Sequence, residues 1–390
     1  MGSSTATADV AEAQQSGFRI LQVQERRDWL RFIAFPYRLY RREPNWVPPL
    51  WIEQRRLLDP ARNPFFEHSQ IALFLAERDG HVIGRIAAIR NGNHLAVHQD
   101  GTGFFGFFEV IPDYEVAAAL LERAAQWLRD RELLLMRGPV NPSLNDTAGV
   151  LLEGFEHPPA LLMPYNPPYY AEFLERFGLR KVMGMYAYYV DVQTVQTDKL
   201  ERGVELVHRR LPDLRVRKVN LKDFEREART VRDIYNEAWR ENWGFVPMTE
   251  REFAHLAQGL RAVVDPHIVF IAELQGQPVG FSVSLPNLNE ALRHVRNGRL
   301  FPCGLVTLLW HTRVRKIRGI RTIIMGVLPA YRGRGIDAVM HYHTIREGMR
   351  RGYRYAELSW VLETNEMMHR AARMVGAVPY KRYALYEMPV

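Results

Sequence analysis

Cysteine is almost absent from this sequence of 390 residues, and so are long apolar runs. The single cysteine, Cys303, excludes an intramolecular disulfide and a zinc site built from cysteines, which is compatible with a reducing cytoplasm. It is expected to be a small buried residue in a loop. No stretch approaches the roughly 18 consecutive apolar residues of a membrane-spanning helix. Residues 1–17 lack the basic and apolar segments of a secretory signal, so we expect a flexible tail on a cytoplasmic protein without a membrane span.

The overall composition is that of an ordinary folded protein. Hydrophobic residues make up 47% and charged residues 25% of the chain. These values exclude a collagen-like, disordered or disulfide-stapled protein, and the length suggests two or three domains.

Acidic residues are scarce in one stretch. Residues 293–354 contain fourteen Arg or Lys but only Asp337 and Glu347 as acids, so the net charge of this stretch is +12. The net charge of the whole chain is +8, so the remaining residues carry −4. A concentrated basic region suggests a polyanionic partner, such as a nucleic acid, an anionic lipid or a phosphorylated small molecule.

An internal repeat organises the chain. Three short segments recur in the same order, and the most similar pair shares Phe, Ala, Glu and two Gly at an offset of 196 residues. We therefore predict a tandem duplication with a joint near residues 191–205: a tail (1–17), a first half (18–200) and a second half (201–390). The paired segments are 74–84 and 270–280, 177–179 and 375–377, and 110–112 and 327–329.

Each half is expected to have the same order of elements, with strands alternating with helices in an α/β (α+β) fold. Apolar spacing and turn residues predict a mixed central sheet flanked by helices in each half. In order, the expected elements are helices 26–40 and 222–240, hairpins starting at 71 and 268, helices 114–131 and 336–351, strands 133–136 and 355–361, and tyrosine-rich strands 185–190 and 383–388.

The sharpest local motif joins a strand, a glycine-rich basic loop and a helix. A β-branched strand runs into Pro329, and Arg332-Gly333-Arg334-Gly335 leads into the helix that starts at Ile336. The first amides of a helix lack intrahelical acceptors and carry partial positive charge, so they bind anions. Glycines let the backbone approach a phosphate closely, which predicts a phosphate site in this loop.

The motif resembles the GNAT superfamily of CoA-dependent N-acyltransferases. The match rests on Val327-x-Pro329, on Arg332-Gly333-Arg334-Gly335-Ile336-Asp337 as the pyrophosphate loop, and on Asn365 followed by Gly376. The resemblance implies two tandem GNAT-like domains, with acetyl-CoA or another acyl-CoA held between two splayed strands. It further implies that the Gly333–Asp337 amides bind the pyrophosphate, and that the Val327 backbone binds the pantetheine and thioester.

Two positions depart from the family pattern, and one half lacks the motif. Asp337 stands where the family has Gly or Ala, and Ala372 replaces a tyrosine often used as general acid. In the first half, residues 115–120 occupy the position equivalent to this loop, and they include no glycine. Its copy is therefore expected to be degenerate and to shape the acceptor side of one catalytic domain.

Three residues are candidates for the chemistry. Glu357 and Ser359 share one face of the strand 355–361 because side chains alternate along a strand, and Glu357 could act as the proton acceptor. Glu241 follows the first helix of the second half, where the resemblance places the acceptor pocket. The proline-rich segment 138–168 could form a pocket wall or join the halves. No metal site is expected.

The sequence thus predicts an N-acyltransferase that transfers an acyl group, expected to be acetyl, from CoA to a small-molecule or peptide amine. The alternatives are a tRNA-dependent aminoacyl transferase on paired GNAT-like domains and a nucleic-acid-associated basic protein. No zinc or RNA-binding signature is present, so a stable nucleic-acid partner is not expected. The acceptor and the oligomeric state stay open.

Overall fold

The computed structural model describes residues 17–390, and the tail expected at 1–17 lies outside these residues except for Gly17. The first half holds nine strands, and each expected element is found within a few residues of its place. Its elements are β1 (Arg19–Gln22), α2 (Arg26–Leu39), α3 (Trp51–Leu57), η1 (Pro64–Glu67), β2 (Ser69–Arg78), β3 (His81–Asn91), α4 (Gly92–His98), β4 (Thr102–Val110), α5 (Tyr114–Arg129), β5 (Leu135–Gly138), β6 (Val140–Asn141), β7 (Thr147–Ala148), β8 (Val150–Glu153), α6 (Tyr169–Phe177) and β9 (Arg180–Asp191).

The second half repeats this order. Glycines bound its long helix α12, with Gly335 before it and Gly352 after it, both in the left-handed region that glycine tolerates. Its elements are α7 (Thr197–Arg210), β10 (Leu214–Lys218), η2 (Leu221–Asp223), α8 (Phe224–Ala238), α9 (Glu250–Leu260), η3 (Pro266–Ile268), β11 (Val269–Leu274), β12 (Gln277–Pro286), α10 (Asn289–Leu292), α11 (Gly304–Leu309), η4 (Trp310–Val314), β13 (Gly319–Val327), η5 (Pro329–Tyr331), α12 (Ile336–Arg351), β14 (Tyr355–Leu362), α13 (Glu366–Met374) and β15 (Val378–Pro389).

The repeat predicted from the sequence is visible in backbone detail. The β2–β3 hairpin shifts register after Ala76 and the β11–β12 hairpin after Ala272, which are equivalent positions 196 residues apart. Both hairpins also turn through two residues with positive φ, Asp79-Gly80 and Gln275-Gly276. Such turns match the twist of the paired strands. The tandem duplication is therefore confirmed at the level of individual turns.

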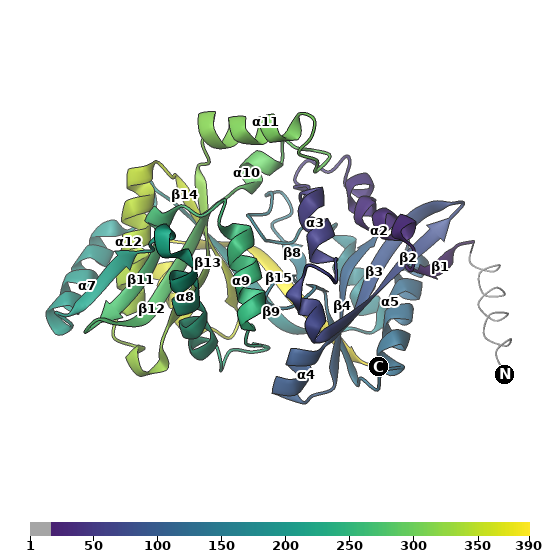
Figure 1. Ribbon diagram of the computed structural model, residues 1–390, viewed down its shortest axis with the longest axis horizontal. Coiled ribbons are helices and arrows are strands. Elements are labelled where there is room, and N and C mark those ends of the chain that lie inside the picture. Colours follow the sequence, from purple (N-terminus) through teal and green to yellow (C-terminus); the bar gives the residue numbers. More distant parts are fainter. Residues whose placement is uncertain (1–16) are drawn as a thin grey trace.

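One mixed sheet runs through both halves, because each half completes the other. The strand order is β1-β2-β3-β4-β5-β15-β9-β14-β13-β12-β11-β10, and β8 pairs with β15. The last strand of the chain, β15, lies between β5 and β9 of the first half, whereas β9 pairs with β14 of the second half. The final strands of the two repeats are thus exchanged, and Figure 1 shows β9 and β15 at the centre of the molecule.

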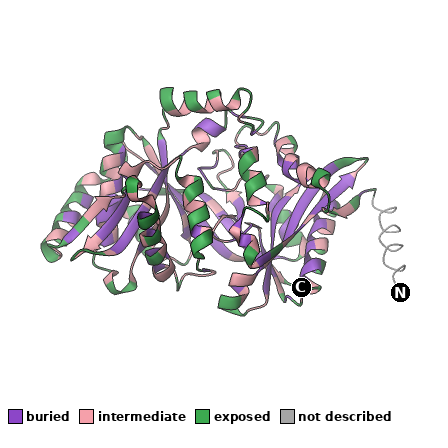
Figure 2. Cartoon of the chain, viewed as in Figure 1, coloured by how far each residue is buried: buried purple, intermediate pink, exposed green. Residues whose placement is uncertain are grey.

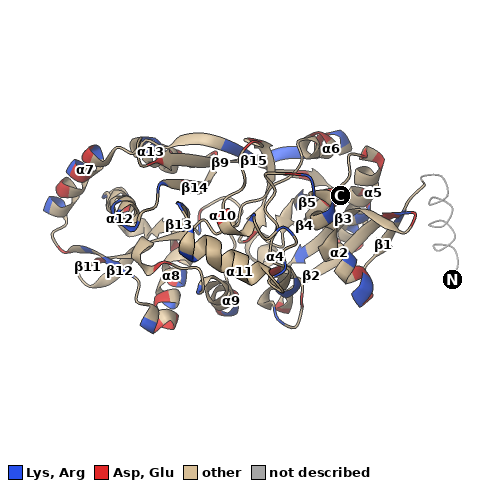
Figure 3. Cartoon of the chain, turned by 90° about the horizontal axis from the view of Figure 1, so that it is seen from above, with Lys and Arg blue, Asp and Glu red and all other residues tan. Residues whose placement is uncertain are grey.

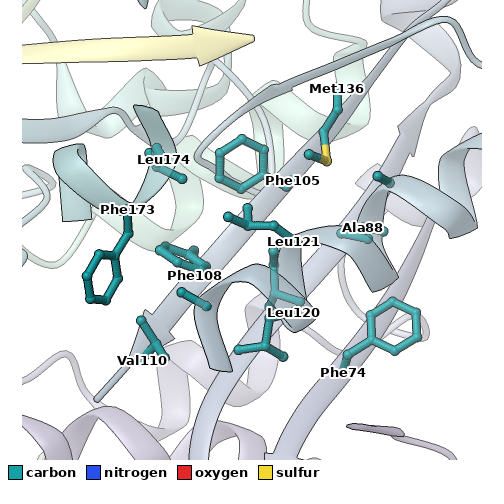
Figure 4. Packing of buried hydrophobic residues seen from close by; sticks show 14 of the residues in the cluster. Phe74, Ala88, Phe105, Phe108, Val110, Leu120, Leu121, Met136, Phe173 and Leu174 are labelled. Carbon is teal, nitrogen blue, oxygen red and sulfur yellow. The ribbon is translucent and has the colours of Figure 1, made fainter. Parts of the chain in front are cut away.

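Helices cover both faces of this sheet. In the first half, α5 and α6 pack on one face around Leu120, Leu121 and Phe105 (Figure 4), and α2 covers the other face. In the second half, α7, α12 and α13 cover one face and α8 with α9 the other. Figure 2 shows that the strands are mainly buried and that the outer sides of the helices are exposed.

Each half contains a pair of parallel strands that diverge. β13 pairs with β14 only from Gly319 to Thr322, and β4 pairs with β5 only from Thr102 to Phe104. Beyond these residues the strands separate. The opening expected between two splayed strands is therefore present at the C-terminal ends of β13 and β14.

Candidate functional site

A large cavity opens where β13 and β14 diverge, and residues from both halves line it. We call it the central cavity; its volume is about 1480 Å³. Its walls include α2, α8, α9, the segment 141–147 of the first half and the beginning of α12. This volume exceeds the roughly 300–1,000 Å³ of a typical small-ligand pocket, so the cavity can hold a long or a composite ligand.

The predicted phosphate loop lies at one end of this cavity. Arg332, Gly333, Ile336 and Asp337 line the cavity, and Gly333 has a φ of 70°. A Cβ atom at Gly333 would meet no atom within 4 Å, so open space faces the loop. The α12 N-terminus directs its free amides there. This geometry fits a pyrophosphate, although Asp337 adds a half-buried carboxylate in the first turn.

The arginines of the loop have different environments. Arg332 donates to the backbone oxygens of Val327 and Ala238, and lies 3.8 Å from the Glu241 carboxylate. It therefore ties the loop to β13 and to the end of α8. Arg334 is exposed and donates to the Ala330 oxygen, so its charge stays available to an anion outside the cavity.

The other residues expected to bind CoA lie near the same opening. Val327 ends β13, and both it and Asn365 line the cavity. The Asn365 side chain accepts from the Met368 amide at 3.1 Å and so caps α13. Of the cofactor-binding residues expected from the sequence, Arg334 and Gly335 are outside the cavity wall, and Gly335 has its Cα against Val207 of α7.

The equivalent opening of the first half is filled. A Cβ atom at Gly106 of β4 would lie 1.6 Å from the Val140 oxygen, and the Asn141 side chain accepts from the Phe107 amide. The short strand β6 therefore occupies the space between β4 and β5. This packing leaves no room for a pantetheine arm in the first half, in accord with the missing glycines at the start of α5.

Glu357 belongs to a buried network behind the cavity wall. Its carboxylate accepts from the Ser359 and Tyr380 hydroxyls and lies 3.8 Å from the Arg321 guanidinium. Glu357 is only 1% exposed and does not line the cavity, whereas Ser359 does. Ser359 thus stands between the cavity and the buried carboxylate. Glu241 lies apart from this network, at the cavity rim, with 85% of its side chain exposed.

Sequence reasoning missed the cations around Glu357. Arg321 donates to the Ser359 hydroxyl at 2.9 Å and to the Leu161 oxygen at 2.6 Å. Lys381 is buried, donates to the Pro158 oxygen, and burial lowers its pKa to about 8. Burial likewise lowers the pKa of Arg321. The position of Arg321 on β13 could be read from the sequence, but one of its partners, the Leu161 oxygen, lies in the other half, 160 residues away.

A second acid, Asp146, faces the cavity from the first half and was also missed. It lies in the proline-rich segment 138–168. This segment forms part of the cavity wall, which is one of the two roles expected for it from the sequence. Burial raises its pKa to about 6, while the Ser143 hydroxyl donates to it at 2.6 Å. Its neighbour Asn145 accepts from Tyr235 of α8 and donates to the Val246 oxygen. A carboxyl with such a pKa can exchange protons near neutral pH.

Among residues 17–390, no group of three or more His, Cys, Asp or Glu side chains could hold a metal ion. None of the helices in this range is both long and apolar enough to cross a bilayer.

Comparison with known proteins reveals several relatives. Residues 228–377 match the Acetyltransferase (GNAT) family. The chain is 36% identical over 368 residues to Protein YghO of Escherichia coli (strain K12), with 93% of each chain covered. It is 35% identical over 382 residues to the Bacterial ceramide synthase of Caulobacter vibrioides (strain NA1000 / CB15N), with 96% of this chain and 98% of that protein covered.

Solved structures share the whole arrangement. A tandem GNAT protein from the clavulanic acid biosynthesis pathway matches with a TM-score of 0.55 at 14% identity, covering 95% of this chain and 98% of that one. A GCN5-related N-acetyltransferase from Sphaerobacter thermophilus matches with a TM-score of 0.53 at 15% identity, covering 95% of both chains. At such identities the likeness concerns the fold, and it confirms the tandem arrangement.

Proposed function

The chain belongs to the GNAT acetyltransferase family, and we propose that it transfers an acyl group from acyl-CoA to the amine of a long-chain, lipid-like acceptor. N-Acyl transfer follows from the family membership. The single observation that supports the lipid-like acceptor is the relative named a ceramide synthase, 35% identical over almost the full length of both proteins. A ceramide is a sphingoid base acylated on its amine, so that name describes N-acyl transfer to a long-chain base.

The second half would hold the acyl-CoA. The amides of Gly333 to Asp337 and the α12 N-terminus would bind the pyrophosphate, and Arg332 and Arg334 would add positive charge. The pantetheine would lie between β13 and β14, with the thioester near Val327. Acetyl-CoA is the donor expected from the sequence. The volume of about 1480 Å³ also supports a longer acyl chain.

The first half would supply the acceptor side of the cavity. Its wall carries apolar side chains from α2 and from the loops around it, which suit an alkyl chain. These include Ile33, Pro36, Trp46, Val47, Leu57, Leu161, Leu162 and Met163.

Amide formation requires that the attacking amine lose a proton. We propose that the Ser359 hydroxyl passes this proton to Glu357, because Ser359 lines the cavity and already donates to that carboxylate. Arg321 occupies one acceptor site of the Ser359 oxygen, and a hydroxyl oxygen has two. The second site is left for the amine. Asp146 is a second proton acceptor on the opposite wall, and Glu241 is a contact for a cationic acceptor at the rim.

The test combines donor binding and turnover. Calorimetry with acetyl-CoA and with long-chain acyl-CoA should give one site per chain, since the first half has no open pocket. Release of free CoA should then be measured with a long-chain amino alcohol and with a short amine. Turnover with the long-chain acceptor only is the expected result. Two acyl-CoA sites per chain, or equal rates with both acceptors, would contradict the proposal.

The same measurements separate the two alternatives. A tRNA-dependent aminoacyl transferase has no need of free CoA, so it would bind none and would release none. A nucleic-acid-associated protein would bind an oligonucleotide more tightly than acyl-CoA, with a steep dependence on salt.

A further inference from the structure

An exposed apolar helix stands at the edge of the molecule, in the segment that precedes β13. We call residues 293–318 the surface helix segment; it contains α11 and the π-helical turn η4. Figure 1 shows α11 at the outer rim, and Figure 2 shows its exposed side. Cys303 in this segment is exposed, so its expected burial is wrong, because the segment lies outside the core. The exposed apolar side chains are Phe301 (73%), Val306 (69%), Leu309 (45%), Trp310 (54%) and Val314 (57%).

These apolar side chains share one side of the helix. Val306, Trp310 and Val314 follow each other at intervals of four residues, which places them one above the other on a helix. The opposite side of the segment faces the protein: the half-buried Leu300 and Leu308 pack against a cluster of Val47, Leu50 and Leu292. The outward apolar side is therefore not needed to hold the helix in place.

Positive charge surrounds this apolar side without compensation. The segment has seven Arg or Lys, no acid, and every one of the seven is exposed. In the described chain none of them forms an ion pair, whereas Arg350 and Arg351 of α12 do. In Figure 3, α11 is largely tan, while α7 carries both blue and red. The seven are Arg293, Arg296, Arg299, Arg313, Arg315, Lys316 and Arg318.

The surface helix segment adjoins the central cavity. Val47 and Leu292 belong both to the cluster under α11 and to the cavity wall, as does Leu288 of the loop before α10. Side chains that pack under the surface helix segment therefore also form part of the cavity wall.

We propose that the surface helix segment docks the protein onto a bilayer that contains anionic phospholipids. Interfacial helices bury an apolar side at the level of the lipid headgroups while basic residues beside it attract anionic lipids. Tryptophan is enriched at that depth. A nucleic acid would account for the arginines but not for five exposed apolar side chains. Docking goes beyond the acyl transfer proposed above, since binding to vesicles requires no turnover.

The experiment is flotation of the full chain with vesicles, without substrates. One set contains phosphatidylcholine only, and the other an equal mixture of phosphatidylcholine and phosphatidylglycerol. The charge variant is Arg313→Ser/Arg315→Ser/Lys316→Ser, and the apolar variant is Val306→Ser/Trp310→Ser/Val314→Ser. A matched control on α7, at a distance from α11, is Leu206→Ser/Arg209→Ser/Arg210→Ser, because these side chains are also exposed.

The native protein and the α7 control should bind the anionic vesicles with equal affinity. Both should bind the neutral vesicles much more weakly. Loss of three cations should weaken binding about 100-fold, and salt of about 1 M should have a similar effect. The affinity of the apolar variant for anionic vesicles should decrease by at least about tenfold. All variants change exposed residues, so their melting temperatures should match the native one.

Four outcomes would overturn the proposal. The first is equal flotation with neutral and anionic vesicles, and the second is native affinity in both α11 variants. The third is preferential binding of a single-stranded oligonucleotide that the charge variant abolishes while vesicles stay unbound. A dimer in light scattering that Trp310→Ser dissociates, without vesicle binding by the native protein, would assign the face to a second copy instead.

Discussion

The Glu357 carboxylate has two hydroxyl donors and one guanidinium nearby. Ser359 and Tyr380 donate to different oxygens of the carboxylate. Arg321 is 3.8 Å away and compensates part of the negative charge in a buried place. On the cavity side of the network lie Ser359 and Arg321, whereas Glu357 does not line the cavity. A change at Glu357 should therefore affect the transfer of a proton more than the binding of either substrate.

Glu357→Gln keeps the shape of the side chain and removes its basicity. We expect kcat to fall by about 10²–10⁴-fold, the usual loss of a general base, with little change in acyl-CoA affinity. Steady-state kinetics and calorimetry measure the two effects. The control is Glu363→Gln, which removes an exposed ion pair with Lys181; such pairs contribute about 1 kcal/mol or less. Native kcat in Glu357→Gln would show that the carboxylate is structural.

Asp146 should make stability depend on pH in the acidic range. Burial raises its pKa from 3.8 to about 6 in the folded protein. As pH rises, Asp146 loses its proton in the unfolded chain before it does so in the folded protein. The free energy of unfolding therefore decreases between about pH 4 and 6 and stays at the lower value above pH 6. Two pKa units correspond to about 3 kcal/mol. Asp146→Asn should flatten the curve of melting temperature against pH in this window.

Activity offers a separate readout for the same residue. If Asp146 accepts the amine proton, kcat/KM of the native enzyme rises with pH through about 6, since the ionised form is the base. In Asp146→Asn this rise should disappear, together with most of the activity. If Asp146→Asn loses the pH dependence of stability but keeps the native dependence of kcat/KM on pH, Asp146 lines the cavity without accepting the proton.

The loop before α12 functions as an element because its conformation depends on two glycines with positive φ. Gly333 has a φ of 70° and Gly335 a φ of 82°. A side chain at such a φ costs about 1–2 kcal/mol, and the backbone would relax away from it and redirect its amides. Gly335 is the less informative position, since a Cβ there would lie 2.6 Å from a Val207 methyl group and disturb α7.

Gly333→Ala should therefore weaken acyl-CoA binding by at least about tenfold while the fold persists. The matched control is Gly276→Ala in the β11–β12 turn, where φ is 78° and a Cβ would also meet no atom within 4 Å. Both variants should lose a similar amount of melting temperature, but only Gly333→Ala should lose affinity in calorimetry. If Gly333→Ala and Gly276→Ala bind acyl-CoA with equal affinity, this loop does not bind the pyrophosphate.

At the scale of the whole molecule, the exchange of β9 and β15 makes the two repeats interdependent. A first half alone lacks the strand between β5 and β9, and a second half alone lacks β9, one of the two strands that pair with β14. Further contacts cross the cavity, such as His68 with Glu252 and Asn289 with the Pro159 oxygen. Unpaired strand edges are prone to aggregation, so neither half should be stable by itself.

The predicted boundary at 200/201 falls inside α7, so a chain divided between residues 193 and 194, in the segment that joins β9 to α7, tests this interdependence. Co-expressed halves should co-purify through a tag on one of them and bind one acyl-CoA, because β15 and β9 can still pair. Each half expressed alone should be insoluble or melt at a much lower temperature. Two halves that are separately monomeric and fully folded would contradict the exchange, and a first half that binds acyl-CoA would contradict its degenerate site.

The sequence by itself determined the features that depend on neighbouring residues. Helix α12, the two hairpins and the loop at Gly333 follow from periodicity, from turn residues and from helix-start chemistry, all of which act within a few positions. The repeat itself was readable for the same reason, since equivalent turns need equivalent residues. Family membership could be expected from one such local motif.

Only the tertiary structure decided how distant segments meet. The exchange of β9 and β15 and the position of the segment around Asp146 at the cavity, where Asn145 meets Tyr235 of α8, depend on contacts between the halves. The bond from Arg321 to the Leu161 oxygen spans 160 residues. Burial then changes the chemistry, as the pKa values of Asp146 and Lys381 illustrate. No local pattern encodes such shifts, because desolvation comes from side chains that are remote in sequence.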